Sequence, residues 1–239
     1  MESVKPYKKA FDYSYALGAF PTFEMLNTMP KTVMQVLVHS SFTEKEKINE
    51  ICSKHRIPVF ENDKLIAKLS DKENVFVVGI FEKFNKTLAD DKSHMVFVNP
   101  GNMGNLGTNL RTAVAFGIKN IALINPAPDI FNPKVIRASM GAVFRLNFQY
   151  FDTFEEYRKA YPKHEIFTFM LNAKEQLTVY NCPKPELFSL VFGNEASGLP
   201  DEFLEVGKSI IIPQSDEVDS LNITIAVGIG AYMFSSGNI

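Results

Sequence analysis

The chain has 239 residues, of which 46% are hydrophobic and 22% are charged, as is typical of a globular protein with one or two domains. The formal net charge of −2 argues against a partner held mainly by non-specific attraction to phosphates, so any contact with nucleic acid must be local. Two distant cysteines and four histidines give neither a disulfide framework nor a zinc motif, and no signal peptide or bilayer-spanning segment is recognisable. We therefore expect a soluble cytoplasmic protein without a metal centre.

The first third of the chain has the pattern of a small α/β unit. Apolar and β-branched residues predict buried strands at 33–39, 57–60 and 74–81. Between the first two, residues 42–56 carry apolar side chains at helical spacing among charges, which predicts an amphipathic helix. Asn62 or Asp63 can cap a further short helix.

A polar stretch, residues 82–93, lacks apolar periodicity and separates two apolar strands, so we place a linker there. The predicted domains are therefore residues 1–81 and residues 94–239. In the second domain, strand and helix signals alternate, with strands at 95–98, 121–124, 166–170, 189–192 and 209–212. These strands are continuously rather than alternately apolar, which predicts a mostly parallel sheet covered on both faces.

Residues 94–117 combine a strand, a loop with three glycines (GNMGNLG) and a helix that ends at Gly117. Such a junction can present backbone N–H groups to an anion. The glycine spacing fits neither the dinucleotide fingerprint nor a Walker A loop, and no acidic residue ends the second strand, so a common nucleotide-binding loop is disfavoured. Asn105 can cap the helix or bind a ligand, and Arg111 can be a solvated arginine or one that binds phosphate.

Two further stretches carry polar residues after strands. In residues 187–200, two glycines bracket Glu195, which can serve the dipole of the following helix or face a ligand. In residues 209–234, an acidic loop leads to Ser220, which looks like a helix N-cap, and to Asn222 two positions later. Each stretch alone has a structural interpretation of about the same weight as the functional one.

Taken in order, GNLGTNLRTA, LVFGNEASGL and IPQSDEVDSLNITIA closely resemble the three motifs of the SpoU (TrmH-like) family of SPOUT methyltransferases. The resemblance covers residues 95–234, and residues 132–146 are similar to the family's stretch after the second strand. Residues 1–81 resemble, less specifically, the L30e-like RNA-binding domain that often precedes it. In that domain Pro21 departs from the usual glycine-led helix and puts the start of the helix in doubt.

The resemblance implies a trefoil-knotted α/β domain that transfers a methyl group from AdoMet to the ribose 2′-hydroxyl of structured RNA, ribosomal or transfer. Backbone groups near three residues would hold the cofactor: Gly193, Ile212 and Leu221. Five residues would form the catalytic site that faces the RNA: Asn105, Arg111, Glu195, Ser220 and Asn222. A guanidinium remains protonated, so we expect Arg111 to bind a phosphate and polarise the hydroxyl rather than act as an ordinary base.

The resemblance also implies a homodimer whose active site is completed in part across the interface. The first motif is doubled, so Asn102 competes with Asn105 for the family's asparagine, and the spacing to Arg111 favours Asn105. Two alternatives stay open at this stage: an RNA-binding protein of this kind without catalysis, and a nucleotide-using α/β enzyme. The sequence does not indicate which RNA or which nucleotide is modified, because structured RNA is recognised by its shape and its splayed bases, which no simple residue pattern encodes.

Overall fold

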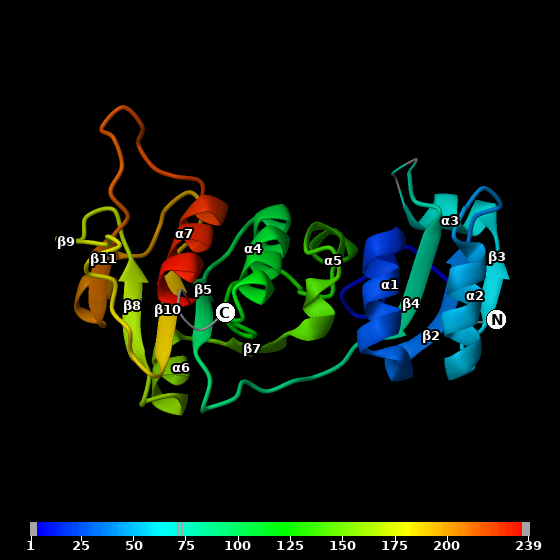
Figure 1. Cartoon of the computed structure of the whole chain (residues 1–239), viewed down its shortest axis with the longest axis horizontal. Coiled ribbons are helices and arrows are strands. Elements are labelled where there is room, and N and C mark those ends of the chain that lie inside the picture. Colours follow the sequence, from blue (N-terminus) through cyan, green and yellow to red (C-terminus); the bar gives the residue numbers. More distant parts are fainter. Residues whose placement is uncertain (1–3, 71, 73, 236–239) are drawn as a thin grey trace. The chain divides into compact units, whose positions relative to one another are not determined.

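Seven parallel strands form the sheet in the C-terminal part of the protein (Figure 1). The computed structural model describes residues 4–70, 72 and 74–235. The strands are β5 (His94–Val98), β6 (Asn120–Ile124), β7 (Asn147–Phe151), β8 (Glu165–Phe169), β9 (Glu175–Gln176), β10 (Phe188–Phe192) and β11 (Lys208–Ile211). Their order is β7-β6-β5-β10-β8-β11-β9, and each neighbouring pair runs parallel. The predicted mostly parallel sheet is confirmed, whereas the knot stays a prediction.

Helices cover both faces of this sheet, as strands that are apolar on both sides require. They are α4 (Met103–Ala115), α6 (Phe154–Ala160), the 3-10 helix η3 (Asp201–Glu205) and α7 (Ile223–Ser235). α4 and α7 lie side by side on one face (Figure 1), and α6 and η3 cover the other. Along β10, Phe188 contacts Phe234 of α7, and the next residue, Ser189, bonds to Tyr157 of α6. Among the helices described, none has the length and apolar content that a membrane crossing requires.

Four polar side chains form a buried hydrogen-bonded chain at the amino-terminal edge of this sheet. His94 Nε2 lies 2.8 Å from the carbonyl oxygen of Ala89, which can only accept, so His94 Nδ1 accepts from Tyr157 at 2.9 Å. By the same reasoning Ser189 donates to Tyr157, and His164 donates to Ser189 at 2.9 Å. Burial lowers the pKa of His94 to about 4 and also lowers the pKa of His164. Both histidines are therefore neutral at physiological pH.

The N-terminal part of the chain contains a four-stranded mixed sheet of order β1-β4-β2-β3. Its strands are β1 (Tyr13–Leu17), β2 (Val33–Val38), β3 (Val59–Glu61) and β4 (Val77–Glu82). Its helices are α1 (Ala19–Thr28), the 3-10 helix η1 (Pro30–Thr32), α2 (Lys45–His55) and α3 (Asp63–Leu69). β4 lies antiparallel to β1 and β2, and β2 lies parallel to β3. The sequence pattern missed β1, and the expected small α/β unit is present.

Helix α1 begins at Ala19 even though Pro21 stands in its first turn. Gly18, with a φ of 99°, occupies the N-cap position, and the N–H of Thr22 donates to its carbonyl oxygen at 3.2 Å. The first N–H groups of a helix have no intrahelical acceptor, so a proline in the first turn loses no hydrogen bond. The helix start that Pro21 put in doubt is therefore intact and led by glycine.

Residues 129–145 pack with the N-terminal part of the chain. The chain divides into one unit formed by residues up to 84 with 129–145, and a second formed by residues 85–128 with 146 onward. The segment that crosses over holds α5 (Pro133–Ala138) and the 3-10 helix η2 (Ala142–Arg145), and Arg145 pairs with Glu24 of α1. The sequence pattern instead placed this segment inside the domain predicted for 94–239. The predicted linker has neither helix nor strand from 83 to 93.

Candidate active site

A pocket of about 200 Å³ opens at the carboxyl-terminal edge of the parallel sheet. Its walls come from the segments that follow β8, β10 and β11 and from the first turn of α7, because the carboxyl ends of parallel strands meet at one edge. All three residues predicted for the cofactor line it: Gly193, Ile212 and Leu221. Two of the five predicted for the catalytic site also line it: Glu195 and Ser220. Asn105, Arg111 and Asn222 are not among its lining residues.

A tight turn after β10 forms one wall of the pocket. The N–H of Asn194 donates to the carbonyl oxygen of Gly198 at 3.2 Å, and the N–H of Gly198 donates back to Asn194 at 2.9 Å. A Cβ at Gly193 would lie 2.2 Å from the carbonyl carbon of Gly198, and Gly198 itself has a φ of 69°. Only glycine fits either requirement without strain, which accounts for both glycines of the motif.

Glu195 joins this turn to the segment that leads into α4. Its Oε2 accepts from the N–H of Gly101 at 2.9 Å, and its Oε1 accepts from the N–H of Asn102 at 3.1 Å. Asn194 adds a third bond, from its Nδ2 to the carbonyl oxygen of Asn99 at 2.8 Å. The sequence pattern indicated that backbone N–H groups of this loop could bind a ligand anion. In the structure, the N–H groups of Gly101 and Asn102 instead donate to the carboxylate of Glu195. This occupancy argues against a phosphate at the glycine loop.

Asn102, rather than Asn105, caps α4. The Oδ1 of Asn102 accepts from the N–H groups of Gly104 and Asn105, at 2.8 and 3.0 Å. The helix begins at Met103, so Gly104 and Gly107 lie inside it and not in the loop where the sequence pattern placed them. The Asn102 cap fixes the start of the helix at Met103, ahead of the two later glycines of the predicted loop. Asn105 is left half-buried in the first turn.

Arg111 lies on the exposed face of α4. Gly104, Thr108 and Ala115 share this face at helical spacing, so the neighbouring positions on the helix surface carry small side chains. Arg111 follows Met103 by eight residues, which places it roughly 12 Å along the helix axis from the helix start. The pocket of a single chain is therefore built without it.

Asn222 takes the N-cap position of α7 that the sequence pattern gave to Ser220. Its Oδ1 accepts from the N–H and the hydroxyl of Thr224, both at 2.8 Å, and its carbonyl oxygen accepts from the N–H of Ile225 at 2.9 Å. The helix starts two residues later than Ser220 would allow, because Asn222 satisfies the free N–H groups of its first turn. Ser220 is consequently free of capping, exposed, and part of the pocket wall.

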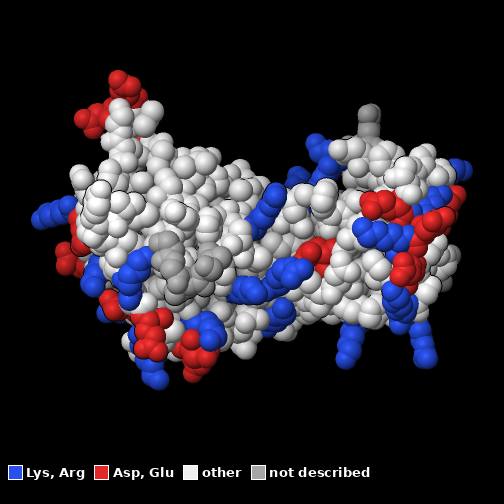
Figure 2. Space-filling view, viewed as in Figure 1, with Lys and Arg blue, Asp and Glu red and all other residues white. Residues whose placement is uncertain are grey.

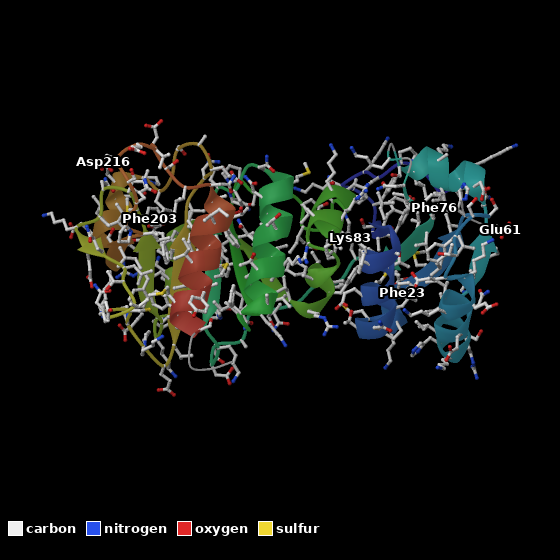
Figure 3. The ribbon with its side chains drawn as sticks, turned by 45° about the horizontal axis from the view of Figure 1, so that its top comes forward. Phe23, Glu61, Phe76, Lys83, Phe203 and Asp216 are labelled. Carbon is white, nitrogen blue, oxygen red and sulfur yellow. The ribbon has the colours of Figure 1, made fainter. Side chains whose placement is uncertain are left out.

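The loop between β11 and α7 carries three exposed acidic residues: Asp216, Glu217 and Asp219. Figure 2 shows acidic side chains gathered at its tip, and Figure 3 shows Asp216 pointing outward from it. The two ends of the loop, at Gln214 and Ser220, line the pocket. The loop therefore places negative charge beside the pocket, where RNA phosphates are unfavourable.

Sequence reasoning did not single out Asn194 or Leu171. The partner of Asn194 lies 95 positions away, so nothing local in the motif indicates the bond. Leu171 lines the pocket although its side chain is 58% exposed. Its position directly after a predicted strand was the available signal, because residues after parallel strands reach the ligand edge.

Known proteins resemble the part of the chain that contains this site. The family described as SpoU rRNA Methylase matches residues 92–232. The chain is 33% identical over 132 residues to an uncharacterised tRNA/rRNA methyltransferase of Synechocystis, covering 54% of this chain and 47% of that protein. It is 30% identical over 132 residues to the 23S rRNA (guanosine(2553)-2′-O)-methyltransferase of Bacillus subtilis, covering 54% and 52%. The chain thus spans about half the length of these curated relatives.

A solved structure extends the likeness to the N-terminal part. The AdoMet-bound rRNA methyltransferase from Sinorhizobium meliloti superposes with a TM-score of 0.76 at 25% identity, covering 93% of this chain and 86% of that one. The family match covers more than half of the chain and contains the turn after β10, the capped start of α4 and the loop before α7. The chain belongs to the SpoU rRNA Methylase family.

Proposed function

We propose that the protein transfers the methyl group of AdoMet to a ribose 2′-hydroxyl in structured RNA, either ribosomal or transfer RNA. The observation that carries the proposal is the pocket at the carboxyl edge, whose wall includes Gly193, Ile212 and Leu221. Family membership and the relative that methylates guanosine in 23S rRNA support it. A cytosolic location agrees with this substrate and with the two free cysteines.

The residues of the pocket suit AdoMet. Isoleucine and leucine side chains supply an apolar wall for a planar base, and the turn after β10 exposes backbone groups that can bond to polar edges. When bound, AdoMet supplies a methyl group on a cationic sulfonium. The acidic loop beside the pocket favours a cation there.

We assign to Arg111 the binding of a phosphate next to the target ribose and the polarisation of its 2′-hydroxyl. AdoMet would supply the methyl group to the hydroxyl oxygen and leave as S-adenosylhomocysteine, and the hydroxyl proton would pass to solvent with the bound phosphate assisting. Asn105, Ser220 and Asn222 position the ribose and the loops. Glu195 acts as a positioning residue, because its carboxylate is bonded to the N–H groups before α4.

We also propose a homodimer in which Arg111 of one subunit serves the pocket of the other. α7 leaves apolar residues uncovered, with Ile225 at 53% exposed and Tyr232 at 58%, two turns apart on one helical face. These residues lie on the helix that packs beside α4, the helix of Arg111. An uncovered apolar helix face of this kind suits a second copy of the chain.

Calorimetry with S-adenosylhomocysteine, NAD and ATP tests the cofactor assignment. Binding of the first ligand alone is expected, and binding of NAD or ATP instead would point to the nucleotide-using alternative. Nucleoside mass spectrometry of ribosomal and transfer RNA after incubation with the protein and AdoMet tests the reaction. Binding of RNA and cofactor without any 2′-O-methylated nucleoside would favour the non-catalytic alternative.

The composite site can be tested by mixing two impaired variants at an AdoMet concentration too low to fill the pocket of Gly193→Ala. Arg111→Ala keeps an intact pocket, and Gly193→Ala keeps an intact arginine, so a mixed dimer regains one complete site if Arg111 acts across the interface. We expect methylation to return on mixing. No recovery, in a preparation that light scattering shows to exchange subunits, would place Arg111 in the same subunit as its pocket. A monomer at micromolar concentration would remove the dimer.

We propose that residues 1–81 contribute to RNA selection. The unit that contains them carries 15 basic and 12 acidic side chains, against 10 and 15 in the unit that holds the pocket. Phosphates are therefore attracted more to the first unit. Replacing the exposed Lys64 and Lys68 of α3 by Glu should weaken RNA binding and reduce its salt dependence, with unchanged binding of S-adenosylhomocysteine. Unaltered RNA binding would contradict this role.

A further inference from the structure

A rigid turn after β9 carries two apolar side chains into solvent. The N–H and the hydroxyl of Thr178 both donate to Asn181 Oδ1, at 2.7 and 3.0 Å, and Asn181 Nδ2 donates to the carbonyl oxygen of Gln176 at 2.6 Å. The N–H groups of Asn181 and Cys182 donate to the carbonyl oxygen of Thr178, at 3.3 and 3.1 Å. These five bonds hold the turn in one conformation.

The two central residues of this turn are uncovered. Val179 is 73% exposed and Tyr180 is 97% exposed, whereas Leu177, directly before the turn, is buried. A tyrosine ring this exposed adds almost nothing to the stability of a single chain, because folding removes little of its surface from water. Its place in a rigid turn suits contact with another molecule instead.

Two hydrogen bonds attach the end of the turn to the C-terminal part of α7. The Sγ of Cys182 donates to the carbonyl oxygen of Met233 at 3.3 Å, and Lys184 Nζ donates to the same oxygen at 2.8 Å. Tyr180 precedes Cys182 by two residues, so their Cα atoms lie within about 7 Å of each other. Met233 directly follows Tyr232, which is exposed on α7. The turn therefore lies beside the uncovered apolar face of α7.

This surface continues to the end of α4. The ring of Tyr232 meets the ring of Phe116, the residue after α4, edge-on with their centroids 6.0 Å apart. α4 itself packs beside α7, and the turn, α7 and α4 all belong to the unit that holds the pocket. Four large apolar side chains of the turn and α7 are more than half exposed: Val179, Tyr180, Ile225 and Tyr232.

The charge and the size of this surface indicate a protein partner. Its four exposed residues are uncharged, and the unit that carries them has 10 basic and 15 acidic side chains, so phosphates are not attracted there. Each partner in an interface of standard size buries about 800 Å². A tyrosine side chain can bury roughly 150–250 Å², so Tyr180 offers roughly a fifth to a third of that area. The two half-exposed residues of α7 alone offer too little for a stable dimer.

We propose that the turn is buried against a second copy of the chain, in the same interface as the uncovered face of α7, with Tyr180 as its anchor. This inference rests on the homodimer of the proposed function. Tyrosine is enriched in protein interfaces, and a side chain on a rigid turn loses little conformational entropy on binding. A two-fold interface contains each contact twice, so every dimer buries two copies of Tyr180.

The chain contains no tryptophan, so Tyr180→Trp places a single fluorescent reporter in the turn. On dilution, its emission should shift to longer wavelength over the concentration range in which light scattering shows the dimer to dissociate, because the indole passes from protein into water. Phe20→Trp is the matched control, since Phe20 is 71% exposed on α1, in the other unit. Its emission should not change on dilution.

Tyr180→Ala should raise the dissociation constant of the dimer by at least about tenfold, because each dimer loses two aromatic contacts. Tyr180→Phe keeps the ring and should change this constant by less than about threefold. Phe20→Ala should leave it as in the natural chain. Sedimentation at several protein concentrations measures the constant, and circular dichroism checks that each variant is folded. Because Arg111 is assigned to the pocket of the other subunit, Tyr180→Ala should lose methylation at dilutions where the natural chain stays active.

An unchanged dissociation constant in Tyr180→Ala, with Tyr180→Trp emission that does not respond to dilution, would overturn the proposal while the dimer itself stands. Emission that ignores dilution but is quenched by ribosomal or transfer RNA would assign the turn to RNA instead. A natural chain that is monomeric at micromolar concentration contradicts both the dimer and this inference. A dimeric chain that methylates no RNA contradicts only the proposed reaction.

Discussion

Polar residues have opposite environments at the two edges of the parallel sheet. At the carboxyl edge, Ser220 and the acidic loop are exposed around a pocket, and Glu195 bonds only to backbone N–H groups. At the amino edge, His94 and Ser189 are fully buried and belong to a chain of side chains bonded to one another. The first arrangement exposes polar groups to a ligand, whereas the second buries its polar groups and pairs all but His164 Nε2 within the protein. Replacing a polar residue should therefore have a different effect at each of the two edges.

The difference follows from the direction of the strands. Segments that follow parallel strands converge at one edge. There the chain forms tight turns, and some of its polar groups keep hydrogen-bonding capacity that a ligand can use. Segments that enter the strands are covered by α6 and by the stretch before β5, so their polar groups must find partners within the protein. We expect substitutions at the carboxyl edge to affect activity and those at the amino edge to affect stability.

Arg111→Ala should produce the largest effect, a loss of about 100- to 1,000-fold in the rate of methyl transfer, as for other single electrostatic contacts in a transition state. The free energy of unfolding should stay within about 0.5 kcal/mol, because the side chain is exposed. Single-turnover methylation and chemical denaturation measure the two quantities. Arg158→Ala, at an exposed position on α6, is the matched control. Near-normal methylation by Arg111→Ala would contradict the role assigned to Arg111.

The stability of the amino edge should depend on pH between about 4 and 6.5. The pKa of His94 is about 4 in the folded protein and 6.5 ordinarily, so in this window the unfolded chain binds a proton that the folded chain does not. The free energy of unfolding should therefore fall by about 3 kcal/mol as the pH drops from 6.5 to 4, and this contribution should level off below 4. Denaturation at several pH values measures it.

His94→Gln should remove most of that pH dependence, because a glutamine amide does not titrate. The exposed His55→Gln on α2 should leave the dependence as it is in the natural chain. If both variants show the same slope of stability against pH, the buried chain at the amino edge does not carry the effect.

Gly193→Ala should weaken cofactor binding by about 1–3 kcal/mol, since the added Cβ meets backbone atoms of the turn at 2.2 Å and the wall of the pocket must shift. Gly228→Ala offers the matched change, because a Cβ there meets nothing within 4 Å. It should leave binding unchanged and slightly favour the helix. Calorimetry with S-adenosylhomocysteine compares them, and equal affinities would contradict the geometry.

Glu195→Gln should have the smallest effect, about 1 kcal/mol in stability and a few-fold in methylation. A glutamine can accept from one of the two N–H groups but points its own donor at the other. Thermal denaturation and initial rates measure the change, with the exposed Glu205→Gln on η3 as control. A loss as large as that of Arg111→Ala would mean that Glu195 takes part in the reaction itself.

Local patterns predicted the parts of this site that depend on neighbours in sequence. Apolar runs located five of the seven strands of the parallel sheet and missed β7 and β9, and the direction of the strands brings Gly193, Ile212 and Leu221 to one pocket. The order of the three motifs predicted the family, which is confirmed. The assignment of individual residues to cofactor and RNA stays a prediction.

The amino-acid sequence by itself determined most of the strands, the parallel sheet and the family, because these follow from periodicity and from motifs within short windows. Only the tertiary structure decided that Glu195 holds Gly101, that residues 129–145 pack with α1, and that Tyr180 stands in solvent while His94 is buried. Partners tens of residues apart meet only after folding. A tyrosine or a histidine can occupy either environment, and its exposure is set by the elements that pack around it.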